Sequence, residues 1–117
     1  MSSFNKYPHV FSPIKIGGME VKNRVQFSPM VSSLSTPTGA VSPELLGYIK
    51  YQAQSGVGVI TIGSTPINHT NGVDFFGALD VTSDDNMTDL RRISEVVHRY
   101  GAKVSCELVH AGRSAPK

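Results

Sequence analysis

Two short segments carry the side chains best suited to chemistry, and each lies at the end of a strand-like run. Residues 24–30 end in Ser28, Pro29 and Met30, and residues 105–113 contain Glu107 and His110. A rigid proline turn beside a polarizable methionine offers a surface for a flat aromatic ligand, and a carboxylate can accept a hydrogen bond from a ligand N–H. Reactive groups of α/β proteins collect at the carboxyl ends of parallel strands, so we expect both segments to border a ligand site.

Strand alternation determines where Glu107 points. Ser105, Glu107 and Val109 share one face of the run, and the apolar pair Cys106 and Leu108 shares the other. We expect the apolar face to meet helices and Glu107 to face the interior, where an unpaired charge is costly. The carboxylate therefore either binds a ligand N–H or forms an ion pair with a lysine or arginine, and the sequence leaves both open.

The functions of the other polar residues near the strand ends are less specifically indicated by the sequence. His110 could be an acid–base group, a ligand contact or a loop anchor. Ser64 follows Gly63, and such small residues let a ligand approach the backbone or simply form a turn. The spacing of His9 and His69 gives no metal site. The glycines at 56, 58 and 63 do not form a dinucleotide-binding fingerprint.

The elements that position these residues alternate between strands and helices. Two apolar runs around Gly17-Gly18 predict a β-hairpin, and Pro29 ends the short strand that follows. Ser42-Pro43-Glu44 and Ser83-Asp84-Asp85 have the capping chemistry of helix starts, and glycines end both helices. The predicted elements are the hairpin 14–21, strand 25–28, a helix from 42 to 56, strand 57–62, a loop 63–82, a helix from 83 to 101, and strand 102–109.

This β-α-β-α-β order after a hairpin predicts a parallel sheet with right-handed crossovers. Three strands and two helices bury the sheet incompletely, and a complete eight-unit barrel needs about 250 residues. We therefore interpret residues 1–117 as one partial domain, the amino-terminal part of a TIM (β/α)8 barrel. The alternatives are a small, complete α/β module for ligand binding or interaction, and a barrel enzyme of another class, such as a lyase.

Composition excludes several classes of protein. Hydrophobic residues make up 39% and charged residues 17%, which is typical of a globular chain. The 11 basic and 9 acidic residues form no basic stripe, so we expect no nucleic-acid partner. The single cysteine excludes a disulfide framework, and no apolar run could span a membrane. Without a secretory leader, a cytoplasmic location is expected.

From about Phe11 to Arg113 the chain resembles the start of the old yellow enzyme family of flavoproteins. The similarity is closest to the branch of 2,4-dienoyl-CoA reductases, 2-enoate reductases and bile-acid-processing reductases. The resemblance rests on five short stretches, each of which is weak evidence alone, but their order and spacing are specific to the family. The stretches are Phe11-Ser12-Pro13-Ile14, Lys22-Asn23-Arg24, Ser28-Pro29-Met30, Gly56-Val57-Gly58-Val59-Ile60 and His110-Ala111-Gly112-Arg113.

The resemblance implies an FMN site at the carboxyl-terminal mouth of a barrel. Ser28, Pro29, Met30 and Val31 would line the flavin ring, and Ser64 would lie beside it. Glu107 would bind the pyrimidine edge, where many members have glutamine. His110 and Arg113 would shape the rim. Valine at 31 and serine at 33 depart from members that have cysteine or threonine at the first position and a substrate-side tyrosine at the second.

The resemblance also implies a reaction for the parent protein. NAD(P)H would reduce FMN, and the flavin would pass hydride to an activated C=C bond of a small enoyl-type substrate. The family's catalytic groups have no counterpart within residues 1–117, so we expect this chain alone to be inactive. The substrate, the choice between NADH and NADPH, an iron–sulfur cluster in the remainder and a homo-oligomer stay open.

Overall fold

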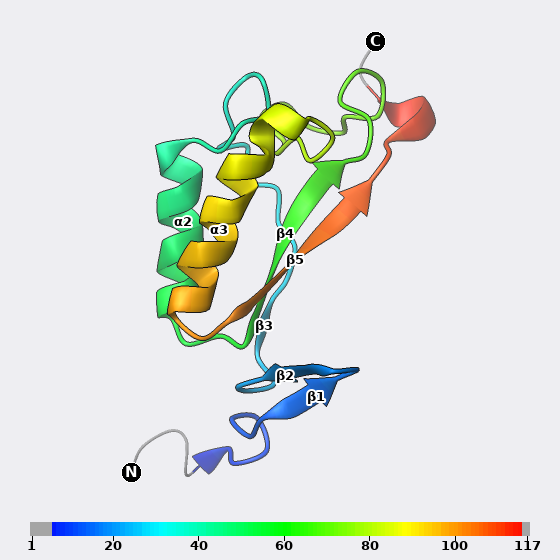
Figure 1. Ribbon diagram of the computed structural model, residues 1–117. Coiled ribbons are helices and arrows are strands. Elements are labelled where there is room, and N and C mark those ends of the chain that lie inside the picture. The colour runs from blue at the N-terminus through cyan, green and yellow to red at the C-terminus, as the bar shows by residue number, and fades with distance from the viewer. Residues whose placement is uncertain (1–5, 116–117) are drawn as a thin grey trace.

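The computed structural model describes residues 6–115 and contains two small sheets (Figure 1). Strands β1 (Ile14–Ile16) and β2 (Met19–Val21) form an antiparallel hairpin. Strands β3 (Gln26–Phe27), β4 (Val59–Pro66) and β5 (Lys103–Val109) form a parallel sheet in the order β3-β4-β5. Helix α2 (Pro43–Gln54) connects β3 to β4, and helix α3 (Met87–Arg99) connects β4 to β5. Short 3-10 turns cover Asp84–Asn86 and Gly112–Ser114. The predicted hairpin and β-α-β-α-β order are confirmed.

The predicted capping residues begin both helical segments. The Ser42 hydroxyl accepts the amide hydrogen of Leu45 at 2.9 Å and donates to the carbonyl of Leu34. Ser83 accepts the amide hydrogen of Asp85 at 3.3 Å and begins the 3-10 turn that leads into α3. Both hydroxyls satisfy amide groups that the first turn leaves without a partner.

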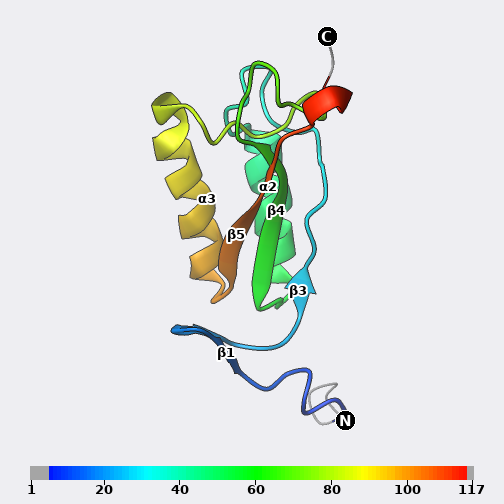
Figure 2. The same ribbon diagram turned by 90° about the vertical axis from the view of Figure 1, so that its right-hand side faces the viewer.

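Both helices pack on one side of the three-stranded sheet, as Figures 1 and 2 show. Apolar side chains recur every three or four residues on each helix, so each presents one face to the strands. Burial of this face against β4 forms the core and removes it from water. The buried core residues are Val41, Leu45, Ile49, Ala53, Val57, Ile60, Leu79, Ile93, Val97 and Ala102.

The opposite face of the sheet carries a hydrogen-bonded polar row. The Gln26 side-chain amide donates to the Thr61 hydroxyl at 2.7 Å, and Thr61 lies 2.9 Å from the Ser105 hydroxyl. Because side chains alternate along a strand, Thr61 points away from the helices that contact Ile60 and Ile62. In a closed barrel this face is the interior.

The hairpin is tied to the amino-terminal end of the sheet by the Lys22-Asn23 pair. The Asn23 side chain donates to the carbonyl of Gly56 at 2.8 Å and accepts the amide hydrogen of Val25 at 3.1 Å. Lys22 donates to the carbonyl of Tyr100 at 2.7 Å. These residues of the family-like motif therefore join the hairpin to the helix ends, which leaves the opposite, carboxyl-terminal end for a ligand.

Strand boundaries are the main corrections to the sequence analysis. Strand β4 begins two residues later than predicted and continues to Pro66, so the segment predicted as a loop from residue 63 is partly strand. Pairing with β5 resumes after an irregularity, with Thr65 opposite Leu108, and the Thr65 hydroxyl donates to the carbonyl of Glu107 at 2.8 Å. Strand β3 is only Gln26–Phe27, and β5 begins at Lys103 rather than at residue 102. Among the described residues, no helix is long and apolar enough to cross a membrane.

Candidate functional site

Pro29, Gly63 and Glu107 meet on the inner face near the carboxyl ends of the strands. A Cβ atom built on Gly63 would lie 2.5 Å from the Pro29 Cβ and 2.6 Å from the Glu107 Oε2. No L side chain fits between these neighbours, so the glycine lets the Glu107 side chain lie across β4 toward Pro29. The result is a surface on which the Glu107 carboxylate lies next to the Pro29 ring.

The Glu107 side chain is exposed, and within residues 6–115 it forms no ion pair. The polar row of Gln26, Thr61 and Ser105 lies on the same face of the sheet, nearer the hairpin. An ionised carboxylate can only accept hydrogen bonds, so this position selects a ligand group that carries an N–H or O–H. The predicted orientation of β5 is supported, since Cys106 and Leu108 line a groove with Leu90 and Ile93 of α3 instead.

The residues after β3 provide the second side of this surface. Ser28 is exposed, and Met30 is 60% exposed although its sulfur lies 3.9 Å from the Tyr48 hydroxyl, which donates to it. Tyr48 also packs edge-on against Phe27, with ring centroids 6.5 Å apart. These contacts hold the start of the loop against α2 and leave Met30 open to a ligand.

Ser64 is placed differently from the other predicted contacts. The residue is only 7% exposed, and its hydroxyl donates to the Asp74 Oδ2 at 2.5 Å. Its side chain therefore anchors the 67–82 loop, and only its backbone remains for a ligand beside Gly63. Asp74 was missed by the sequence analysis, because a lone acidic residue in a polar loop carries no local signal. Its Oδ1 is buried without a hydrogen-bond partner among the described residues.

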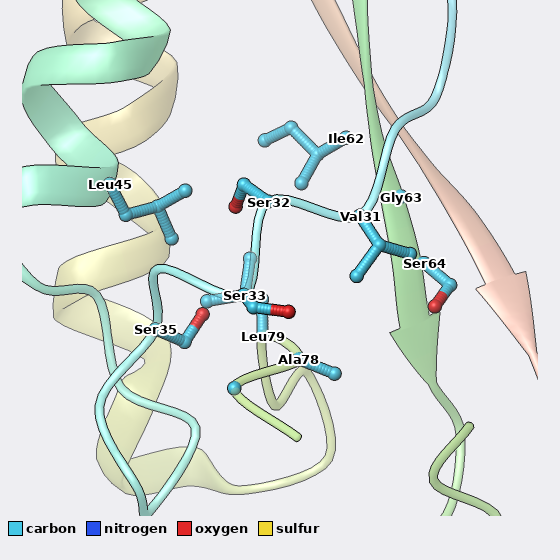
Figure 3. Close-up of a pocket in the computed structure, with 11 residues that line it drawn as sticks. Val31, Ser32, Ser33, Ser35, Leu45, Ile62, Gly63, Ser64, Ala78 and Leu79 are labelled. Atoms are coloured by element: carbon cyan, nitrogen blue, oxygen red, sulfur yellow. The ribbon is translucent and has the colours of Figure 1, made fainter. Parts of the chain in front are cut away.

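Val31, Ser33 and Ser64 line a small cavity behind this surface (Figure 3). The cavity volume is about 10 Å³, which is room for about one water molecule. A ring system therefore cannot enter it, and the ligand surface is the open inner face. Ser33 has a positive φ of 54°, and its carbonyl oxygen would lie 2.8 Å from a Cβ at Gly77. Ser33 thus turns the chain against the Gly77 loop.

His110 and Arg113 lie further along the segment that follows β5. The His110 Nδ1 accepts the amide hydrogen of Gly112 at 3.0 Å, and a Cβ at Gly72 would lie 2.8 Å from the His110 ring. The amide of Ala111 also donates to the carbonyl of Gly72 at 2.9 Å. His110 therefore packs two loops together, whereas Arg113 is exposed and forms no hydrogen bond or ion pair among the described residues.

Within residues 6–115, two groups outside the ligand surface have shifted pKa values. Burial alone would raise the pKa of Asp80, but hydrogen bonds from the Thr82 hydroxyl and amide, with the charge of nearby His69, lower it overall. Partial burial raises the pKa of the Cys106 thiol, which makes the thiolate scarce at neutral pH. No cluster of three or more His, Cys, Asp or Glu side chains that could hold a metal occurs within residues 6–115.

The arrangement defines a class of protein: the first units of a parallel (β/α) barrel, with a ligand face at the carboxyl ends of its strands. The comparisons then identify the family. Residues 9–117 match the model of the NADH:flavin oxidoreductase / NADH oxidase family, and the chain belongs to this family.

Individual relatives support this membership. The chain is 33% identical to the NADH oxidase of Thermoanaerobacter brockii, over 92% of this chain and 16% of that protein. It is 31% identical to the NADPH dehydrogenase of Halalkalibacterium halodurans, over 91% of this chain and 31% of that protein. The structure of the Old Yellow Enzyme from Pichia sp. AKU4542 superposes with a TM-score of 0.83 at 27% identity, over 92% of this chain and 28% of that one. The chain thus spans between about one sixth and one third of the length of these relatives.

The described residues fit a flavin in hydrogen-bonding chemistry. Gly63 is buried beneath Pro29 and Glu107, so a planar ring would lie against these two side chains and the exposed Met30 rather than on the glycine. The exposed Glu107 carboxylate can accept an N–H at the edge of such a ring.

Proposed function

We propose that residues 1–117 form one wall of the FMN site of a flavin-dependent oxidoreductase. The observation that carries this proposal is the exposed Glu107 carboxylate packed against Pro29 over the buried Gly63, next to the exposed Met30, at the mouth of the partial barrel. Family membership supports FMN as the ligand and NAD(P)H as the reductant. Bound FMN would transfer hydride from NAD(P)H to an activated C=C bond of a small-molecule substrate.

The residues of this chain bind and orient the flavin. Met30 and the Pro29 turn support one side of the ring, and Gly63 makes room for Glu107 to lie next to Pro29. Glu107 accepts an N–H from the ring edge. Ser28, Val31 and the backbone of Ser64 complete the wall, and Ser33, His110 and Arg113 shape its rim.

Glu107 also bears on the branch of the family. Many members have glutamine at this position, and a carboxylate would repel a ring carbonyl next to the N–H unless it is protonated or screened. We assign the chain to the branch of 2,4-dienoyl-CoA, 2-enoate and bile-acid reductases, in which glutamate occurs here. An activated enoyl compound is the substrate that this assignment implies.

A flavin titration of the chain alone tests its role as one wall. Since the proposed wall would contact only one side and one edge of a ring, we expect weak FMN binding or none, measured by quenching of flavin fluorescence. We also expect no NAD(P)H-dependent reduction of an enoate. Stoichiometric FMN binding with turnover by this chain would contradict the proposal, because it would mean that the site is complete within residues 1–117.

A further inference from the structure

An open groove lies between α2 and α3, on a side of the helices different from the one that covers the sheet. Its residues on α2 are Pro43, Leu46, Gly47 and Lys50, which recur at helical spacing and alternate with the core positions Leu45 and Ile49. Its residues on α3 are Arg92, Val96 and Arg99, with Tyr100 at one end. The groove volume is about 330 Å³.

The groove has basic edges around an apolar floor. Lys50 lies on one wall and Arg99 on the other, both are exposed, and within residues 6–115 neither forms an ion pair. Arg92 pairs with Asp89 at 3.0 Å, but both side chains are partly exposed, so the pair is weak and Arg92 can exchange Asp89 for another carboxylate at little cost. Leu46, Val96 and Tyr100 are half-buried and supply the floor.

Gly47 leaves the α2 wall of this groove without a side chain at its middle. It lies in the interior of a 12-residue helix, where glycine is less favourable than alanine. A Cβ built on Gly47 would meet no atom within 4 Å, so no contact among residues 6–115 requires glycine there. The exposed backbone leaves the floor accessible to an external element that packs closely against it.

We propose that this groove binds an acidic amphipathic helix of a partner protein. A helix laid between two helices buries an apolar stripe on the floor of the groove. Carboxylates on both sides of that stripe would then meet Lys50 on one wall and Arg92 and Arg99 on the other. This surface is separate from the inner face, so the proposal does not depend on the flavin site.

The test uses synthetic peptides as probes, with binding followed by fluorescence anisotropy at physiological ionic strength. The first peptide has leucines on one helical face and glutamates on both sides of them. A second has lysines in place of the glutamates, and a third is a scrambled peptide of the same composition as the first. We expect the chain to bind the glutamate peptide and neither of the others. Equal binding of the scrambled peptide would overturn the proposal, because charge alone would then explain the affinity.

Variants of the groove assign the binding to its walls and floor. The double variant Lys50→Glu/Arg99→Glu should bind the glutamate peptide roughly tenfold or more weakly than the original chain, and it should gain affinity for the lysine peptide. Gly47→Met should weaken binding of the glutamate peptide to a similar extent. Both Gly47→Met and Gly47→Ala should raise the melting temperature of the free chain, because glycine is unfavourable inside a helix. Lys15→Glu on the hairpin is the matched control and should leave the affinity unchanged. Binding that survives Gly47→Met, or self-association that Arg99→Glu abolishes, would overturn the proposal.

Discussion

At the scale of single residues, Gly63 controls the shape of the candidate site. A methyl group in Gly63→Ala would overlap the rigid Pro29 ring and the end of the Glu107 side chain, at 2.5 Å and 2.6 Å. The carboxylate can move, but the ring cannot, so we expect a loss of about 1–3 kcal/mol in the free energy of unfolding. Urea unfolding measures the loss, and NMR signals of Glu107 should shift.

Gly18→Ala is the control for this substitution. A Cβ at Gly18 would meet no atom within 4 Å, so its effect should stay within about 0.5 kcal/mol. Equal stability of the two variants, with unmoved Glu107 signals, would show that Pro29, Gly63 and Glu107 are not packed together.

Asp80 makes stability depend on acid pH. Its pKa is lowered in the folded chain from the ordinary value of 3.8, although burial acts in the opposite direction. A group whose pKa is lowered stabilises the fold above its unfolded pKa and loses this contribution as pH falls through its folded pKa. Asp80→Asn should therefore lower the urea midpoint at neutral pH and show a smaller fall in midpoint below about pH 4.

Urea titrations across this pH range measure the effect, with Glu20→Gln on the exposed hairpin as a control. An unchanged acid profile in Asp80→Asn would contradict the role of the hydrogen bonds from Thr82.

Residue-level prediction from the sequence succeeded where a simple periodicity applied. Strand alternation gave the direction of Glu107, and capping chemistry gave Ser42 and Ser83. It could not find the bond between Ser64 and Asp74, because the two residues meet only when the loop folds back on β4. The role of each site residue in binding a ligand stays a prediction.

At the scale of elements, helix α2 is stabilised both by its buried face and by the Ser42 cap at its amino-terminal end. Ile49 is 2% exposed in the core between the helices and β4, so Ile49→Ala should lower the free energy of unfolding by about 2–5 kcal/mol. Ser42→Ala should lower it by about 1 kcal/mol or somewhat more, because the hydroxyl both caps the helix and donates to Leu34.

Tyr51 lies on the same helix but is 75% exposed, so Tyr51→Ala should change stability by less than about 0.5 kcal/mol. The three variants are compared by chemical denaturation. A loss in Tyr51→Ala as large as that in Ile49→Ala would contradict the assignment of the buried face.

The order of helices and strands could be predicted because the spacing of hydrophobic residues and the positions of turn residues are visible within short stretches of sequence. The length of β4 could not. Gly63, Ser64 and Pro66 read as a loop, but pairing with β5 keeps them in the strand. Long-range pairing of this kind overrides local preference.

At the scale of the whole molecule, helices α2 and α3 lie on one side of the sheet, and the inner face and β5 are open. Leu108 is 64% exposed in the groove beside α3, which is consistent with a partial barrel. The predicted fold class is confirmed by the superposition on old yellow enzyme structures. The proposed activity depends on parts of the relatives that this chain does not match.

The central claim is that the inner face forms one wall of an FMN site. The most direct measurement is FMN affinity in a chimera in which this chain replaces the matching segment of the Thermoanaerobacter brockii NADH oxidase, with the unmodified oxidase as reference. Loss of a hydrogen bond to a charged group costs about 1.5–3 kcal/mol, so Glu107→Ala should weaken FMN binding roughly tenfold to a hundredfold. Glu20→Ala should leave it unchanged. A folded chimera that binds no FMN, or one whose affinity is the same with and without the Glu107 carboxylate, would contradict the account.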